Sequence, residues 1–123
     1  MKEKNLILQK SMDFAVRSVN MYKYLSSEKN EQIMSKQVYR SGTSIGANVR
    51  EAVNGQSKAD FTAKMSIALK EASETEYWLE LLLKTGYLTR SEYENIQKDC
   101  GELARMLTSI VKTSRETKKQ KVL

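Results

Sequence analysis

The stretch that decides the fold runs from Lys58 to Thr85 and reads KADFTAKMSIALKEASETEYWLELLLKT. Its apolar and small residues recur at alternating spacings of four and three, as on one face of an α-helix. The residues of this seam are Phe61, Met65, Ala68, Ala72, Thr75, Leu79 and Leu82. Gly86 follows at a position that commonly ends a helix. The sequence therefore predicts one long helix over 58–85.

The same spacing predicts three further helices. The first covers Lys4 to Leu25, and the second covers Glu31 to Asn54. The fourth is opened by Thr89-Arg90-Ser91-Glu92, which has the form of a capping box. Its periodicity fades near Ser114, so we expect the lysine-rich end of this helix to fray.

The segments between these helices carry the signals of helix ends. Asn30 is a candidate N-cap for the second helix. Gly55 is placed to end that helix, and Ser57-Lys58-Ala59-Asp60 resembles a capping box with Asp in place of Glu. Loops this short force consecutive helices to be antiparallel neighbours.

The predicted fold class is therefore all-α, an antiparallel up-down-up-down four-helix bundle. The absence of proline among the 123 residues favours long, uninterrupted helices. We expect one bundle domain over residues 1–117 and a basic C-terminal tail over 118–123.

Composition argues against catalysis. The chain has no histidine, which excludes Ser–His pairs, zincin motifs and the Glu-x-x-His di-iron sites of other bundles. Cys100 is the single cysteine and lies on a helix seam, where a buried thiol acts as a small apolar group. Gly42 and Gly46 match no phosphate-loop spacing. We expect no enzyme activity, no cofactor and no metal, in a cytoplasmic protein without a membrane span.

The formal charge of +6 is concentrated near the C-terminus, where residues 112–123 hold five basic residues and one acidic residue. Such charge favours contact with nucleic-acid phosphates, although basic tails also serve only for solubility. Lys36 and Arg40 add a basic pair at i, i+4 on the second helix. The candidate nucleic-acid-binding residues are Lys36, Arg40, Arg50, Lys118, Lys119 and Lys121.

The segment from Arg40 to Glu51, RSGTSIGANVRE, is a poor helix former inside a predicted helix. Its glycines would let neighbouring helices approach closely. Asn48 lies on the apolar seam, so its amide needs a partner, for which a carboxylate on a facing helix is a candidate. We expect a structural polar network that fixes the helix register and contains Ser44, Asn48, Glu51 and Glu74.

The segment Tyr77-Trp78-Leu79-Glu80-Leu81-Leu82-Leu83 is apolar almost all round its helix. A bundle helix buries one face of limited width, so Trp78 and Leu81 require a further cover. Either Trp78 packs on a neighbouring helix and Leu81 stays partly exposed, or both lie in a subunit interface.

Two parts of the sequence together resemble a known family. Ser44-Ile45-Gly46-Ala47-Asn48-Val49-Arg50-Glu51-Ala52 is similar to the motif Ser-Ile-Pro-Ala-Asn-Ile-Ala-Glu-Gly of the four-helix-bundle proteins encoded in 23S rRNA intervening sequences. The departures are Gly46, Arg50 and Ala52, in place of proline, alanine and glycine. The resemblance continues through residues 67–79 and through Gly86-Tyr87-Leu88. That family is in turn similar to the accessory variability proteins of diversity-generating retroelements.

The resemblance implies a small bacterial bundle protein without catalytic activity that assembles into a ring, a homopentamer in known members. In the retroelement branch such rings are basic and bind nucleic acid and a reverse transcriptase. Two functions remain open. One is an oligomeric nucleic-acid-binding accessory factor, with RNA or DNA as the partner. The other is a protein-interaction scaffold with no nucleic-acid role, whose partner is a reverse transcriptase or another protein.

Overall fold

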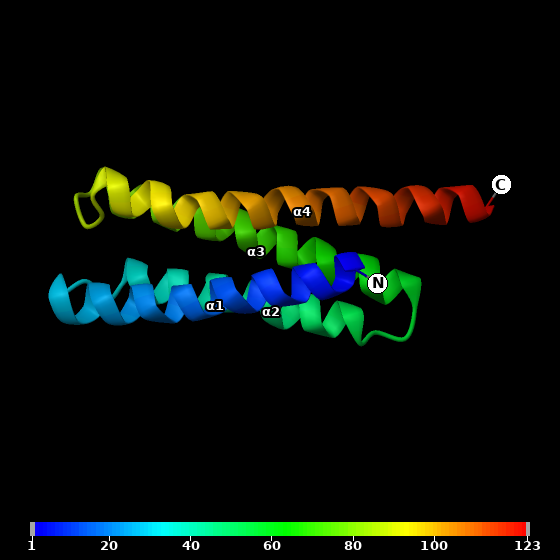
Figure 1. The fold of residues 1–123 in the computed structure, drawn as a ribbon, viewed down its shortest axis with the longest axis horizontal. Coiled ribbons are helices and arrows are strands. Elements are labelled where there is room, and N and C mark those ends of the chain that lie inside the picture. The colour runs from blue at the N-terminus through cyan, green and yellow to red at the C-terminus, as the bar shows by residue number, and fades with distance from the viewer. Residues whose placement is uncertain (1, 123) are drawn as a thin grey trace.

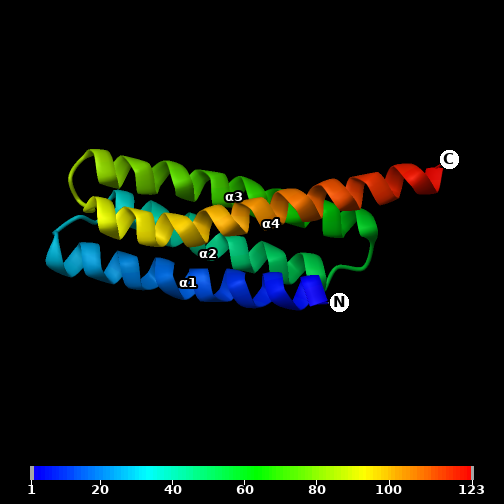
Figure 2. The same ribbon diagram turned by 45° about the horizontal axis from the view of Figure 1, so that its top comes forward.

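The computed structural model describes the backbone of residues 2–122 and the side chains of all of these except 3 and 117–122. Four helices follow one another along the chain: α1 (Lys2–Glu28), α2 (Met34–Val53), α3 (Lys58–Lys84) and α4 (Arg90–Val122). Each helix packs antiparallel to its neighbours in sequence, and α4 also packs against α1, which closes the bundle (Figures 1 and 2). The predicted up-down-up-down four-helix bundle is confirmed.

The turn between α1 and α2 differs from the prediction. Asn30 does not cap α2; it ends α1 in the left-handed conformation, with φ of 55°, while the Glu31 N–H donates to the Leu25 carbonyl at 2.9 Å. The N-terminal cap of α2 comes instead from Glu31, which is 5% exposed. Its carboxylate accepts the backbone N–H groups of Ile33, Met34 and Ser35 at 2.8–3.0 Å.

The environment of Glu31 favours its charged form. Burial by itself would raise the pKa of this carboxyl, but the N–H donors of Met34, Ser35 and Ile33 together hold its pKa below the ordinary value. The first turn of α2 is therefore stabilised by an ionised side chain that lies outside the helix.

The caps predicted at the starts of α3 and α4 and the glycine predicted at the end of α3 are confirmed, whereas α2 ends at Val53, two residues before Gly55. The Ser57 hydroxyl accepts the Asp60 N–H at 3.1 Å at the start of α3. At the start of α4, Thr89 and Glu92 exchange two bonds, at 2.9 and 3.1 Å, which is the full capping box. Gly86 has φ of +85°, the left-handed conformation that a helix C-terminus commonly takes.

The predicted close approach of α2 to a neighbour is also confirmed, and the neighbour is α1. A Cβ at Gly42 would lie 2.8 Å from the Ser18 Cβ, and one at Gly46 would lie 3.2 Å from the Ser11 carbonyl oxygen. Both serines are buried and bond to backbone carbonyls of their own helix. Small residues on both helices therefore bring the α1 and α2 backbones together.

The seam between α1 and α4 is polar and less closely packed than the other three seams of the bundle. Three sets of bonds follow it from the α3–α4 turn toward the chain ends. Tyr24 donates to Glu92 at 2.8 Å, Arg17 to Asp99 and Asn95 at 2.6 and 2.7 Å, and Lys10 to Glu102 at 3.0 Å. We call this series the α1–α4 ladder. Toward the N-terminus of α1, α4 rises away from α1 (Figure 2).

Helix α4 is longer than predicted. It continues to Val122, well past Ser114, where fraying was expected, and it includes most of the segment predicted as a tail. Its last part extends beyond the α2–α3 turn (Figure 2). The physical reason is that Lys, Gln and Glu are good helix formers and that no glycine or proline interrupts residues 102–122.

Candidate nucleic-acid interface

Four cations along the length of the bundle are paired with carboxylates on a neighbouring helix. Lys10 and Arg17 belong to the α1–α4 ladder, and Lys64 lies 3.0 Å from Glu51 across α2 and α3. Arg40 contacts both Glu71 and Glu74. These partners offset much of the positive potential that the same side chains would offer to a phosphate.

Arg40, a predicted nucleic-acid contact, lies in a cluster that joins α2 to α3. Its guanidinium bonds to the Glu74 carboxylate and lies 3.5 Å from the Glu71 carboxylate. The indole N–H of Trp78 donates to the same Glu74 oxygen at 3.1 Å. The structure thus brings together Arg40, Glu74 and Trp78, for which the sequence predicted three separate roles.

Two of the four residues of the predicted polar network, Ser44 and Asn48, are joined by a hydrogen bond, whereas Glu51 and Glu74 pair with other residues. The Asn48 amide donates at 2.8 Å to the Ser44 carbonyl in its own helix, and not to a carboxylate on a facing helix as expected. Glu51 pairs with Lys64, and Glu74 belongs to the Arg40 cluster. The carbonyl four residues back is always within reach of a helical side chain, which is why Asn48 needs no facing carboxylate.

The other two predicted contacts on α2, Lys36 and Arg50, are exposed. At 100° per residue, they lie within about 80° of Arg40 around the helix, so the three cations share its outer face. Lys118, Lys119 and Lys121 belong to α4, but their side chains lie outside the described residues.

The structure reveals a basic end that the sequence reading missed. Antiparallel packing brings the N-termini of α1 and α3 to the same end of the bundle as the C-termini of α2 and α4 (Figures 1 and 2). Residues 2–4, 50–64 and 112–122 all belong to this end. They hold ten lysines and arginines against four acidic residues, so they account for the whole formal excess of +6.

We define the basic end by its described cations Lys2, Lys4, Arg50, Lys58, Lys112 and Arg115, all of which are exposed. Among the described residues, none of these six has a carboxylate within ion-pairing distance. Two helix N-termini and two C-termini meet here, so the helix dipoles largely offset one another and the side chains set the sign of the potential. Summing charge by helix end, and not along the chain, would have revealed this surface from the sequence.

The predicted interface residues Trp78 and Leu81 are both half-buried within the single chain. Trp78 packs against the core, and its ring meets Tyr77 edge-on with centroids 5.0 Å apart. Apolar exposure on the outer face of α3 is greatest at Tyr77, with 58%, and at Ile67, with 43%.

The single cysteine takes part in the packing of the bundle. Cys100 is buried, its thiol donates to the Ala72 carbonyl at 3.6 Å, and burial raises its pKa to about 12. No three His, Cys, Asp or Glu side chains of the described residues are grouped in a way that could hold a metal ion. None of the helices, over the residues described, is long and apolar enough to cross a membrane.

Comparison with known proteins finds a protein family and solved structures that are similar to this chain. The model of the family described as 23S rRNA-intervening sequence protein matches residues 3–109. A crystal structure from Bacteroides thetaiotaomicron VPI-5482, of a protein with unknown function from the S23 ribosomal protein family, shares 58% sequence identity with a TM-score of 0.88. That match covers 89% of this chain and 98% of the other. No curated protein matches this chain.

Proposed function

The chain belongs to the 23S rRNA-intervening sequence protein family, and from this premise we propose that it is a non-catalytic accessory protein that binds nucleic acid through its basic end and works as a homo-oligomer. One observation carries the proposal: the whole formal charge excess belongs to one end of the bundle, where six described cations lack a carboxylate partner and Lys64 pairs with Glu51. A polyanion that approaches this end displaces its own counterions, which is the main source of affinity in phosphate binding.

Self-association is supported by the outer face of α3. Ile67 and Tyr77 are exposed there beside the half-buried Trp78 and Leu81. Large exposed apolar patches are uncommon on monomeric proteins, so this face suits a subunit contact. Assembly would place several basic ends on one particle and would strengthen binding to a long nucleic acid through multivalency.

The binding experiment compares a structured RNA and a DNA duplex of equal length by mobility shift over a salt series. Arg50→Gln/Lys112→Gln/Arg115→Gln removes three charges from the basic end. Lys23→Gln/Lys70→Gln/Lys98→Gln is the matched control, because it removes three exposed charges elsewhere. We expect the basic-end variant to lower the slope of log K against log salt by about 2–3, with little change in the control.

Two results would contradict the proposal: the absence of binding at low salt, or an equal loss of affinity in both variants. A separate Lys36→Gln variant tests the outer face of α2, because Lys36 lies away from the basic end. In light scattering, a mass near the 14.1 kDa of one chain would contradict self-association.

A protein-interaction scaffold is the second candidate, and the exposed apolar residues of α3 favour it. It predicts a stable oligomer that binds neither RNA nor DNA at low salt. Retention of a purified candidate partner, such as a reverse transcriptase, should then be lost on Tyr77→Ala and unaffected by the basic-end variant.

A further inference from the structure

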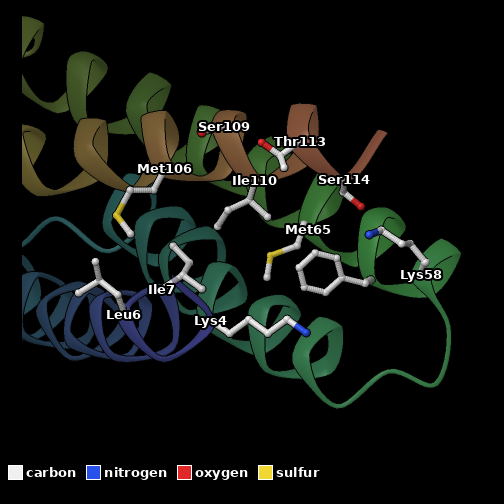
Figure 3. A pocket seen from close by; sticks show the side chains of 11 residues that line it. Lys4, Leu6, Ile7, Lys58, Met65, Met106, Ser109, Ile110, Thr113 and Ser114 are labelled. Carbon is white, nitrogen blue, oxygen red and sulfur yellow. The ribbon is translucent and has the colours of Figure 1, made fainter. Parts of the chain in front are cut away.

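A cavity of about 440 Å³ lies between α1, α3 and α4, where the α1–α4 ladder stops. The last rung is Lys10–Glu102. Beyond it the cavity is lined by six apolar side chains, by two lysines, and by the hydroxyl residues Ser109, Thr113 and Ser114 of α4. Leu6 and Ile7 come from α1, Met106 and Ile110 from α4, and Met65 from α3 (Figure 3). The volume falls in the range of small-ligand pockets, about 300–1,000 Å³.

The cavity separates its charged groups from its apolar groups. Lys4 and Lys58 place their ammonium groups toward one end, while Leu6 and Met106 lie at the opposite end (Figure 3). The ammonium of Lys4 lies 5.1 Å from the centroid of the Phe61 ring, a cation–π distance that holds this charge at the rim of the cavity. A ligand that fits must therefore be apolar along most of its length and anionic at one end.

Charge complementarity sets the sign of that end group. The described residues that line the cavity include two lysines and no carboxylate. Asp60 and Glu116, on neighbouring turns of α3 and α4, are exposed and do not line it. Lys58 is also the first residue of α3, where the helix dipole adds positive potential.

We propose that this cavity binds a free single-chain fatty carboxylate, with the acyl chain along Ile7, Met65 and Ile110 and the carboxylate between Lys4 and Lys58. The two methionines suit an acyl chain because their unbranched, polarizable side chains adapt to irregular apolar shapes. Leu6 is 47% exposed, and the bound acyl chain would cover it. The site is distinct in chemistry from the phosphate contacts of the basic end, since it requires an apolar tail.

The test is calorimetric titration of the full chain with laurate below its micelle concentration, with dodecylamine and dodecanol as probes of equal chain length. We expect saturable binding of one laurate per chain, binding at least about tenfold weaker for dodecanol, and none for dodecylamine. Equal affinity for laurate and dodecylamine, or no saturable binding of laurate, would overturn the proposal.

Two variants locate the site. Lys4→Gln/Lys58→Gln should weaken laurate binding about tenfold or more, because both head-group contacts are lost. Its matched control, Lys23→Gln/Lys98→Gln, should bind as the wild type does, and so should Lys112→Gln/Arg115→Gln, which separates this site from the nucleic-acid proposal. Unchanged binding in the Lys4/Lys58 variant would place the ligand elsewhere and overturn the assignment.

Ile110→Trp should abolish binding by filling the cavity, and circular dichroism checks that this variant folds.

Two further outcomes would identify a different occupant. If Ile110→Trp lowers the oligomer mass while wild type takes up no laurate, the cavity is a subunit contact. Sedimentation with phosphatidylglycerol vesicles, without uptake of free laurate, would indicate a membrane surface. Either result overturns the proposal.

Discussion

Helix α1 has two neighbours, and it meets them in opposite ways. Against α2 it places Ser11 and Ser18 on the backbone of Gly46 and Gly42, so that the spacing between the helices leaves no room for a Cβ at Gly42. Against α4 it places long charged side chains, and Arg17 is the central rung of the resulting ladder.

The difference shows where this bundle tolerates change. Close backbone packing has one arrangement, and an added methyl group forces backbone shifts or unfavourable rotamers. Opening a half-exposed ion pair costs little free energy, because water solvates both partners. We therefore expect the α1–α2 contact to fix the register of the fold and the α1–α4 contact to remain adjustable.

The sharpest way to break the comparison is Gly42→Ala. The new Cβ would collide with the buried Ser18 side chain, so we expect a loss of about 2–3 kcal/mol in the free energy of unfolding, measured with urea. Ser18→Gly in the same chain should recover part of the loss, as a double-mutant cycle would show. Gly101→Ala is the control, because its Cβ would meet only side-chain ends at 3.4 Å or more. A loss at Gly101 equal to that at Gly42 would remove the argument from close packing.

A second prediction concerns the turn that joins α1 to α2. Glu31→Gln keeps the size of the side chain but loses its charge and one acceptor oxygen. We therefore expect the free energy of unfolding to fall by about 1–2 kcal/mol. The pKa of Glu31 is lowered on folding, so its stabilisation is present above the ordinary carboxyl pKa and is lost as the pH falls through the folded value.

The stability difference between wild type and Glu31→Gln should therefore shrink on acidification below about pH 4.3. Unfolding in urea at a series of pH values measures it, and Glu28→Gln, an exposed change one turn earlier, is the control. A difference that stays constant down to the acid transition would show that the Glu31 charge does not cap α2.

The smallest effect is expected on the α1–α4 ladder. Arg17→Met removes the bonds to Asp99 and Asn95. Because the Arg17 side chain is 35% exposed, we expect the free energy of unfolding to fall by only about 0.5–1 kcal/mol. The loss should become smaller in high salt, which screens the exposed pair. A loss as large as that of Gly42→Ala would mean that the two contacts of α1 are equally rigid.

Local signals accounted for most of what could be predicted. The seam of α3, the Thr89–Glu92 capping box and the glycine at 86 depend on residues within one or two turns of each other, and the structure confirms them. Asn30 misled because the same short polar side chain suits an N-cap and a left-handed helix end. Glu31 was overlooked as a cap because it precedes the first residue of α2 by three positions.

Features that depend on register could not be predicted. Arg40 and Glu74 are 34 residues apart in the sequence. Only the packing of α2 on α3 lets the Arg40 guanidinium and the Trp78 indole donate to the same Glu74 carboxylate oxygen. Likewise, the segments of the basic end are scattered along the chain, and their cations share one surface only in the antiparallel arrangement. The cavity has no motif at all, because it exists where two helices diverge.

The α1–α4 ladder also has a kinetic consequence. It joins residues 68–92 positions apart, whereas α1 and α2 meet across a turn of five residues. Closing the long segment is slow and entropically costly, so we expect α1 and α2 to pair early in folding and α4 to dock on α1 late. In native-state hydrogen exchange, the amides of α4 beyond Glu102 should open at a lower free energy than those around Gly42. The last contact to form would then be the first to open, and it borders the cavity.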